Sequence, residues 1–221
     1  MKKYVTLLFL FYYGFVFSQD YVFDYVFEYD LQVKEFQMKK FCYINSKNSN
    51  HFLYLYKAND KTTAIVYDLG TMQEHEFLVT KRIDKDVLHF TFLLQKSITI
   101  SSQYVSKCKN LYYEYTPIQK DSTVNIVELK IYANAKKKQL IDTYELKQIP
   151  SEANFFPAFR NAAMHPMEFC INFDNYENGI ITESKLITKN KGISTSKLVN
   201  YTSILFELTL DTTKIKKNKS R

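Results

Sequence analysis

The chain has 221 residues, of which 46% are hydrophobic, and its formal net charge is +7. This length suits one domain with a core of its own. Of the 30 basic residues, Lys2 and Lys3 lie at the start and five follow Asp211, so 23 basic residues face the 23 acidic ones between residues 19 and 211. The body between residues 19 and 211 carries no net charge, whereas nucleic-acid binding requires a clustered basic surface, and we predict no nucleic-acid partner.

Residues 1–18 have the layout of a secretory signal peptide. Two lysines precede an almost uninterrupted apolar run, and Ser18 is the small residue after which a signal peptidase would cut. The apolar run, residues 4–17, has 14 residues, whereas a membrane-spanning helix needs about 20. We therefore expect cleavage before Gln19 and no transmembrane segment afterwards. No cysteine lies near the cut, so the mature chain is predicted to be periplasmic or secreted and not a lipoprotein.

The start of the mature chain predicts a strand with one aromatic face. Aromatic side chains occupy every second position, which is the period of a β-strand. The residues of this face are Tyr21, Phe23, Tyr25, Phe27 and Tyr29. We expect this face to line the concave side of a sheet and to contact a ligand.

Most of the remaining chain also has the pattern of strands. The ranges are 41–44, 52–56, 64–68, 75–79, 88–94, 98–100, 111–116, 124–131, 139–148, 180–188 and 202–210. No window keeps a helical period, and only the segment 151–169, which follows Pro150 and contains two further prolines and four alanines, favours a short helix. The dipeptide Asn178-Gly179 is typical of a tight hairpin turn.

These elements predict a mainly β protein. The expected fold of residues 19–211 is a single strongly curved antiparallel sheet or open barrel, with the 151–169 connection covering one side or mouth. A β-sandwich is the alternative. Residues 212–221 are expected to form a basic, disordered tail.

Metal-binding motifs fail on their spacing. His75-Glu76 would begin a zinc-protease helix only with a second histidine at position 79, which is Val79. A calcium loop starting at Asp174 would need oxygen ligands where Tyr176 and Lys185 stand. We predict no metal site.

Enzyme motifs are equally scarce. With only Gly70, Gly179 and Gly192 in the mature chain, neither a phosphate-binding loop nor a serine-nucleophile elbow is present, and no cofactor is predicted. Cys170 and His165 could form a thiolate–imidazole pair. The alternating apolar context of Cys170 favours a small buried hydrophobe instead, so no catalytic residue is assigned.

Two interpretations account for the aromatic content. The chain has 18 Tyr, 18 Phe and no Trp, and these rings suit the half-buried faces of an ordinary β core. Alternatively, a partly covered aromatic face admits an apolar ligand such as an acyl chain. The three widely spaced cysteines, Cys42, Cys108 and Cys170, allow at most one intrachain disulfide.

The overall layout resembles the small exported Bacteroidota proteins called GLPGLI. The resemblance rests on Gln19 after the cut, the opening Tyr25-Val26-Phe27-Glu28-Tyr29, the late Asn178-Gly179-Ile180-Ile181 and a Lys/Asn/Ile/Tyr-rich texture. The Gly-Leu-Pro-Gly that names the group is absent. The resemblance implies an envelope protein without assigned activity, similar in architecture to the curved sheets of periplasmic lipoprotein carriers.

The predicted function is that of an exported, non-enzymatic protein of the cell envelope. It would bind an apolar ligand, such as a lipid, or another envelope component. The alternatives are a periplasmic hydrolase and a structural or adhesion module.

Overall fold

A computed structural model describes residues 18–58, 60–84, 87–121, 123–164, 177–188 and 192–211. Residues 1–17 of the predicted signal peptide, the predicted C-terminal tail 212–221 and the pair His165 and Cys170 lie outside the described residues. The described part forms one 11-stranded antiparallel sheet that does not close, together with two short helices. The predicted fold class, a single curved antiparallel sheet, is confirmed.

The strands are β1 (Ser18–Val33), β2 (Phe36–Asn45), β3 (Asn48–Ala58), β4 (Lys61–Asp68), β5 (Gln73–Asp84), β6 (Val87–Thr99), β7 (Tyr112–Lys120), β8 (Asn125–Tyr132), β9 (Leu140–Pro150), β10 (Gly179–Thr188) and β11 (Gly192–Asp211). The helices are α2 (Ser102–Asn110) and α3 (Phe156–Ala163).

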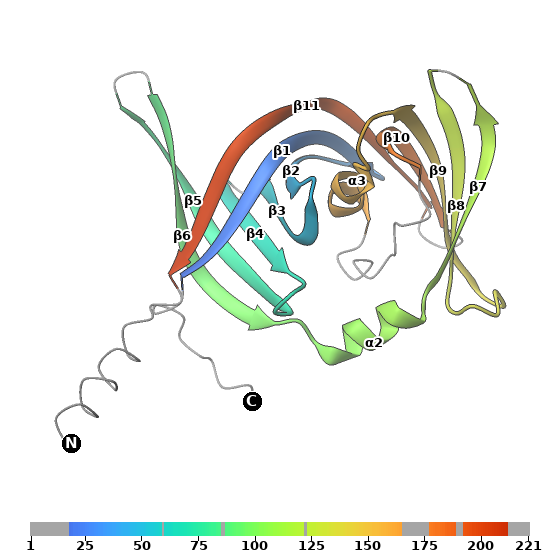
Figure 1. The fold of residues 1–221 in the computed structure, drawn as a ribbon, viewed down its shortest axis with the longest axis horizontal. Coiled ribbons are helices and arrows are strands. Elements are labelled where there is room, and N and C mark those ends of the chain that lie inside the picture. The colour runs from blue at the N-terminus through green and yellow to red at the C-terminus, as the bar shows by residue number, and fades with distance from the viewer. Residues whose placement is uncertain are drawn as a thin grey trace, which may run out of the picture.

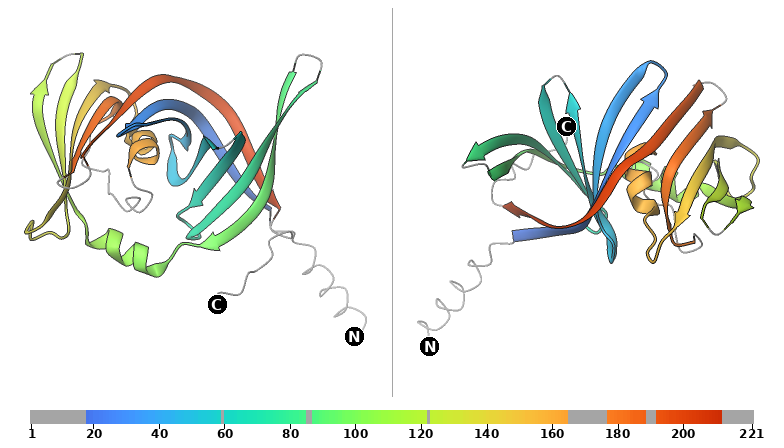
Figure 2. Two further views of the ribbon diagram at one scale, coloured as in Figure 1. Left: turned by 180° about the vertical axis from the view of Figure 1, so that it is seen from behind. Right: turned by 90° about the horizontal axis from the view of Figure 1, so that it is seen from above.

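The order of strands in the sheet is β6-β5-β4-β3-β2-β1-β11-β10-β9-β8-β7. From β1 the chain moves strand by strand to one edge, and α2 then carries it from β6 to β7 at the other edge (Figure 1). From β7 it returns strand by strand until β11 pairs with β1. The sheet arches around its concave side, on which α3 lies (Figures 1 and 2).

A bend in the two central strands gives the protein two hydrophobic cores. The register between β1 and β11 shifts between Phe23 and Tyr25, and pairing with β2 begins only at Tyr25. Bulges of this kind bend a strand and increase its twist. The first part of β1 and the last part of β11 therefore leave the concave side and pack on the other face of β3 to β5.

The main core lies on the concave side and contains α3, whereas the second core lies on the opposite face of the same strands. On β3, Phe52 and Tyr54 belong to the main core and Leu53 to the second, as expected for side chains that alternate between faces. The buried members of the second core are Tyr21, Phe23, Leu53, Ala64, Val66, Phe77, Val79, Leu208 and Leu210.

The helix α3 forms where the sequence predicted a short helix. Pro157 stands in the first turn, where a missing N–H costs nothing, and alanines follow. The side chain of Asn154 accepts a 3.0 Å hydrogen bond from the backbone N–H of Phe156, which satisfies one of the free donors at the helix start.

The dipeptide Asn178-Gly179 does not serve as the predicted hairpin turn. Gly179 is the first residue of β10, and a Cβ atom there would lie 2.3 Å from Nε2 of Gln148. Glycine is needed at this position because the Gln148 side chain packs directly against the backbone.

Candidate functional site

The structure divides the five predicted ligand-facing aromatics between the two cores. Tyr21 and Phe23 lie in the second core, away from α3, whereas Phe27 and Tyr29 are fully buried in the main core. Tyr25 stands between them and is half-buried against the main core. The face that the sequence treats as continuous is therefore interrupted by the bend of β1, and only Tyr25, Phe27 and Tyr29 face the concave side.

The segment before α3 covers these three residues in part, as the sequence analysis expected. The ring of Phe155 lies edge-on to Tyr25, with centroids 4.8 Å apart, and 5.3 Å from the centroid of Phe27. Phe156 and Phe159 continue the aromatic contacts along the helix and are fully buried. The aromatic residues Phe155, Phe156 and Phe159, at the start of α3 and within it, thus cover part of the concave side.

Lys40 on β2 holds the C-terminal end of this helix. Its ammonium group donates hydrogen bonds of 3.1 Å to the carbonyl oxygens of Asn161 and Ala162, and lies 4.4 Å from the ring centroid of Tyr54. Cations at a helix C-terminus satisfy free carbonyls and interact favourably with the helix dipole. Burial lowers the pKa of Lys40, with nearby Cys42 acting in the opposite direction.

Two further groups show how well the concave side is shielded from water. Burial raises the pKa of the Cys42 thiol to about 12, although Lys40 acts to lower it. The guanidinium of Arg160, on α3, is buried and lies 5.2 Å from the ring centroid of Phe52. Both cations of this interior are therefore placed over aromatic rings, where cation–π attraction offsets part of their desolvation.

A pocket of about 240 Å³ opens beside α3 on the inner face of β7 to β9. Its lining residues are Tyr115, Pro117, Lys120, Asn125, Val127, Gln148 and Glu177. The ring of Tyr115 lies edge-on to Phe156, with centroids 6.0 Å apart, so the pocket adjoins the aromatic cover. Burial raises the pKa of the Tyr115 hydroxyl, and Arg160 acts to lower it.

Two inward-facing positions at this pocket are polar, whereas the next inward-facing positions on the same strands, Val127 and Leu146, are apolar. Asn125 and Gln148 are opposite each other on β8 and β9, with exposures of only 7% and 1%. Gln148 donates a 2.8 Å hydrogen bond to the carbonyl of Glu177. Oδ1 of Asn125 is buried, and no described residue forms a hydrogen bond with it.

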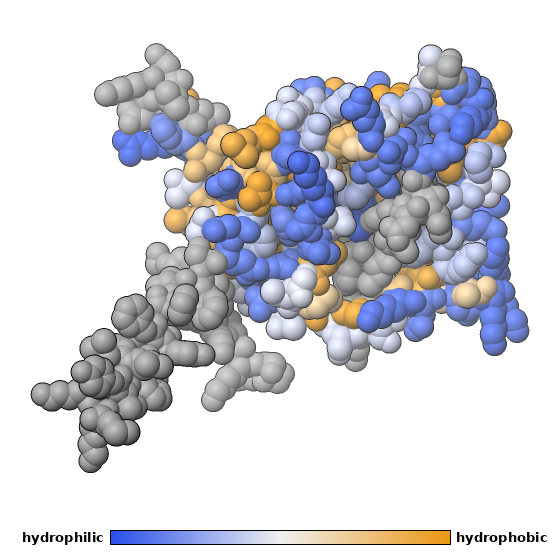
Figure 3. Space-filling view, in the orientation of Figure 1, coloured by the Kyte–Doolittle hydropathy of each residue, from blue (hydrophilic) through white to orange (hydrophobic). Residues whose placement is uncertain are grey.

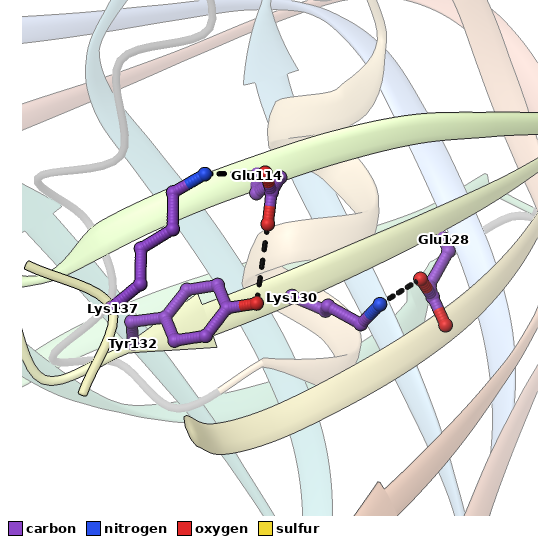
Figure 4. A network of polar contacts seen from close by, with 5 residues as sticks. All are labelled: Glu114, Glu128, Lys130, Tyr132 and Lys137. Carbon is purple, nitrogen blue, oxygen red and sulfur yellow. Dashed lines mark hydrogen bonds and ion pairs between the residues drawn. The ribbon is translucent and has the colours of Figure 1, made fainter. Parts of the chain in front are cut away.

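The outer face of the same strands has an ordinary solvated pattern (Figure 4). Glu114 accepts hydrogen bonds from Lys137 and Tyr132, at 2.5 Å and 3.1 Å, and Lys130 pairs with Glu128. The bond from Lys137 is the main reason why the pKa of Glu114 is lowered. These charges are paired with one another at the surface, where such pairs contribute little to stability.

Apolar side chains on the outer surface gather over the part of Figure 3 where β11 and β5 lie. Leu205, at the bulge of β11, is 83% exposed, and Phe36, at the start of β2, is 78% exposed. Single exposed apolar side chains are normal on protein surfaces, and within the described part of the chain no contact shows what would cover these two.

The second core contains a polar cluster that could be mistaken for a catalytic one. Nδ1 of His75 lies 2.7 Å from the hydroxyl oxygen of Ser97, and the Tyr21 hydroxyl donates a 3.2 Å bond to Asp68. Gln19, the predicted first residue of the mature chain, also donates to Asp68. His75 is completely buried, so no substrate reaches it in this state and the cluster is structural.

In the described part of the chain, no group of three His, Cys, Asp or Glu residues could hold a metal ion. Neither described helix is long and apolar enough to cross a membrane. Cys42 is a free, buried thiol, and Cys108 is buried as well.

The sequence analysis did not single out Lys40, Asn125 or Gln148. None belongs to a motif, and each draws its importance from strands that meet only in the folded sheet. One signal was available for Asn125: it shares the parity of Val127, Leu129 and Ile131, so it takes an inward position of its strand.

No protein-family model and no curated protein matches this chain. The geometry of the concave side is therefore the basis for assigning a function.

Proposed function

We propose that this chain is an exported, non-enzymatic binding protein of the cell envelope that holds an apolar ligand, such as an acyl chain, on the concave face of its sheet. The observation that carries the proposal is the position of α3. The aromatic face is covered by one eight-residue helix and not by strands. Phe155 lies at the N-cap of this helix, and Phe156 and Phe159 are buried on its inner side.

A helix of this length is a suitable movable cover. Isolated helices shorter than about 12 residues are marginal in water, so α3 depends on its contacts with the sheet. Those contacts are apolar packing and the hydrogen bonds from Lys40 to its last turn. An acyl chain could replace the apolar contacts, because the rings beneath α3 offer an apolar surface.

The pocket beside Phe156 provides room at the margin of this cover. Its volume of about 240 Å³ is below the roughly 300 to 1,000 Å³ typical of ligand sites, so a full chain would need α3 to move.

Export is supported by the layout of residues 1–18 and by the resemblance to exported GLPGLI proteins. A periplasmic or secreted location would bring the protein into contact with envelope lipids. In a second form of the same proposal, the partner is another envelope component. A protein that carries an acyl group would present the same kind of hydrocarbon chain as a lipid.

Two matched variants on one strand test the proposal. Phe27 and Phe23 are both fully buried in β1, but only Phe27 lies beneath the α3 cover. Phe27→Leu and Phe23→Leu should destabilise the protein similarly, whereas only Phe27→Leu should alter the binding of a fluorescent polyene fatty acid and the lipid found by mass spectrometry of the native protein.

The proposal fails if the wild type neither binds the fatty acid nor carries an apolar molecule. It also fails if Phe23→Leu changes binding as much as Phe27→Leu does. In that case the effect would come from lost stability and not from the concave face.

A further inference from the structure

The pocket between β7, β8 and β9 contains a buried hydrogen-bond acceptor that the protein does not use. Asn125 is 7% exposed, it lines the pocket, and its Oδ1 atom has no hydrogen-bond partner among the described residues. A buried polar atom left unpaired is costly, and native proteins rarely keep one without a reason. The missing partner of Oδ1 must be a donor.

The charges of the pocket indicate that this donor belongs to a neutral group. Among the described residues of the lining, Lys120 and Glu177 are the charged ones, and they pair with each other at 2.7 Å. Their charges cancel, so neither an isolated ammonium nor an isolated carboxylate on a ligand would find an unopposed counter-charge. Burying such a charge without a partner is unfavourable.

The remaining lining favours hydroxyl groups on a small ring. A hydroxyl group can both donate and accept hydrogen bonds. The hydroxyls of one ring can therefore donate a hydrogen bond to Oδ1 of Asn125 and accept one from Lys120. Tyr115, Pro117 and Val127 form apolar walls against which the C–H face of a ring can pack. A volume of about 240 Å³ suits one such ring.

We propose that this pocket binds a neutral, hydroxyl-bearing group of the size of one sugar ring, through Asn125 Oδ1, and that it is the head-group subsite of the apolar ligand. This inference rests on the proposed function, because the contact between Tyr115 and Phe156 joins the pocket to the α3 cover. The ligand is then an amphiphile whose chain lies beneath α3 and whose head group lies between β7 and β9.

Three probes separate the parts of the ligand in calorimetric titrations of the mature chain. Octyl β-glucoside below its micelle concentration carries both chain and ring, methyl β-glucoside carries the ring alone, and octanoate carries the chain alone. We expect octyl β-glucoside to bind more tightly than either of the other two.

The variant Asn125→Leu removes the acceptor and keeps the branched shape of the side chain, and Asn200→Leu makes the same change at an exposed position of β11. Asn125→Leu should lower the affinity for octyl β-glucoside about tenfold, the value of one hydrogen bond. It should leave octanoate binding unchanged and raise the Tm, because an unpaired buried acceptor disappears. Asn200→Leu should change neither the affinity nor the Tm.

The outcomes separate this inference from the proposed function. If octanoate binds but Asn125→Leu binds octyl β-glucoside as the wild type does, the subsite is wrong and the proposed function stands. If methyl β-glucoside binds, depends on Asn125 and gains nothing from the octyl chain, the pocket is a site for free sugars and the proposed function is wrong. If no probe binds the wild type, or if Asn125→Leu lowers the Tm, the subsite is overturned.

Discussion

The hydroxyl of Tyr29 donates a 2.8 Å hydrogen bond to the carbonyl oxygen of Ile181, which is 152 residues away in the sequence. Tyr29 lies on β1 and Ile181 on β10, and β11 separates these two strands in the sheet. The register between β9 and β10 shifts directly after Ile181, where a bulge interrupts the ladder. The bond therefore ties the first strand, across the concave side, to an irregular point of the sheet.

Tyr29→Phe should lower the free energy of unfolding by about 1 to 3 kcal/mol, because the buried Ile181 carbonyl loses its donor while the ring volume is kept. Urea denaturation measures the change. Tyr201→Phe is the control, since the Tyr201 ring stacks on Phe27 but is 43% exposed. Equal effects of the two substitutions would show that the Tyr29 bond contributes nothing specific.

Gly179→Ala should destabilise the protein by about 1 to 3 kcal/mol, because the new Cβ forces the Gln148 side chain to move. The hydrogen bond from Gln148 to the Glu177 carbonyl would then be lost. Adding Gln148→Ala to Gly179→Ala should cost less than the sum of the two single changes, since the clash is removed. Additive effects in this double-mutant cycle would contradict the close packing of these two residues.

Lys40→Met should lower stability by about 1 to 3 kcal/mol and speed hydrogen exchange in α3, because the last turn of the helix loses its charged donor. Lys39→Met is the matched control. Its ammonium pairs with Glu28 at the surface, 58% exposed, and its loss should leave stability almost unchanged. Exchange in α3 that does not respond to Lys40→Met would show that Lys40 does not hold the helix.

His75 should make the protein less stable in mild acid. Burial lowers its pKa, against the opposing effect of Asp68, so the unfolded chain binds a proton that the folded chain does not. Stability is therefore retained above the unfolded pKa of about 6.5. As the pH drops from there to the lowered folded pKa, the free energy of unfolding falls by at most about 1.4 kcal/mol per pH unit. His75→Leu should reduce this slope, as measured by urea denaturation between pH 7 and 5. If the stability of the variant depends on pH as steeply as that of the wild type, a group other than His75 causes the loss of stability.

Local alternation predicted the strands and the fold class. The predicted strand pattern near residues 202–210 matches part of β11, and the proline- and alanine-rich segment after Pro150 contains α3. The helix α2 was not predicted, because its nine residues are mainly polar and too few to show a helical period. Its position between the two edge strands follows from the topology and not from its own sequence.

The candidate site was less predictable from the sequence. Alternation places Tyr21 and Phe27 on one face, but the register shift after Phe23 sends them to different cores, and a bulge leaves no clear mark in a strand pattern. The pocket depends on Asn125 meeting Gln148 across β8 and β9. Such a pairing is set by register, which a pattern within one strand does not fix.

The movement of α3 is the central claim, and the reactivity of Cys42 tests it most directly. Cys42 is completely buried on β2, opposite Phe27 in the main core. In a Cys108→Ser, Cys170→Ser background, maleimide should reach Cys42 whenever α3 leaves the sheet. The control is Val66→Cys in the same background with Cys42→Ala, because Val66 is equally buried but lies in the second core. It should react only on global unfolding.

We predict that Cys42 is labelled faster than the cysteine at position 66, and that saturating octyl β-glucoside changes the labelling rate of Cys42 alone. Equal labelling rates for the two thiols, unaffected by the amphiphile, would contradict it: α3 would then be a permanent part of the core, and the concave face would not be a ligand site.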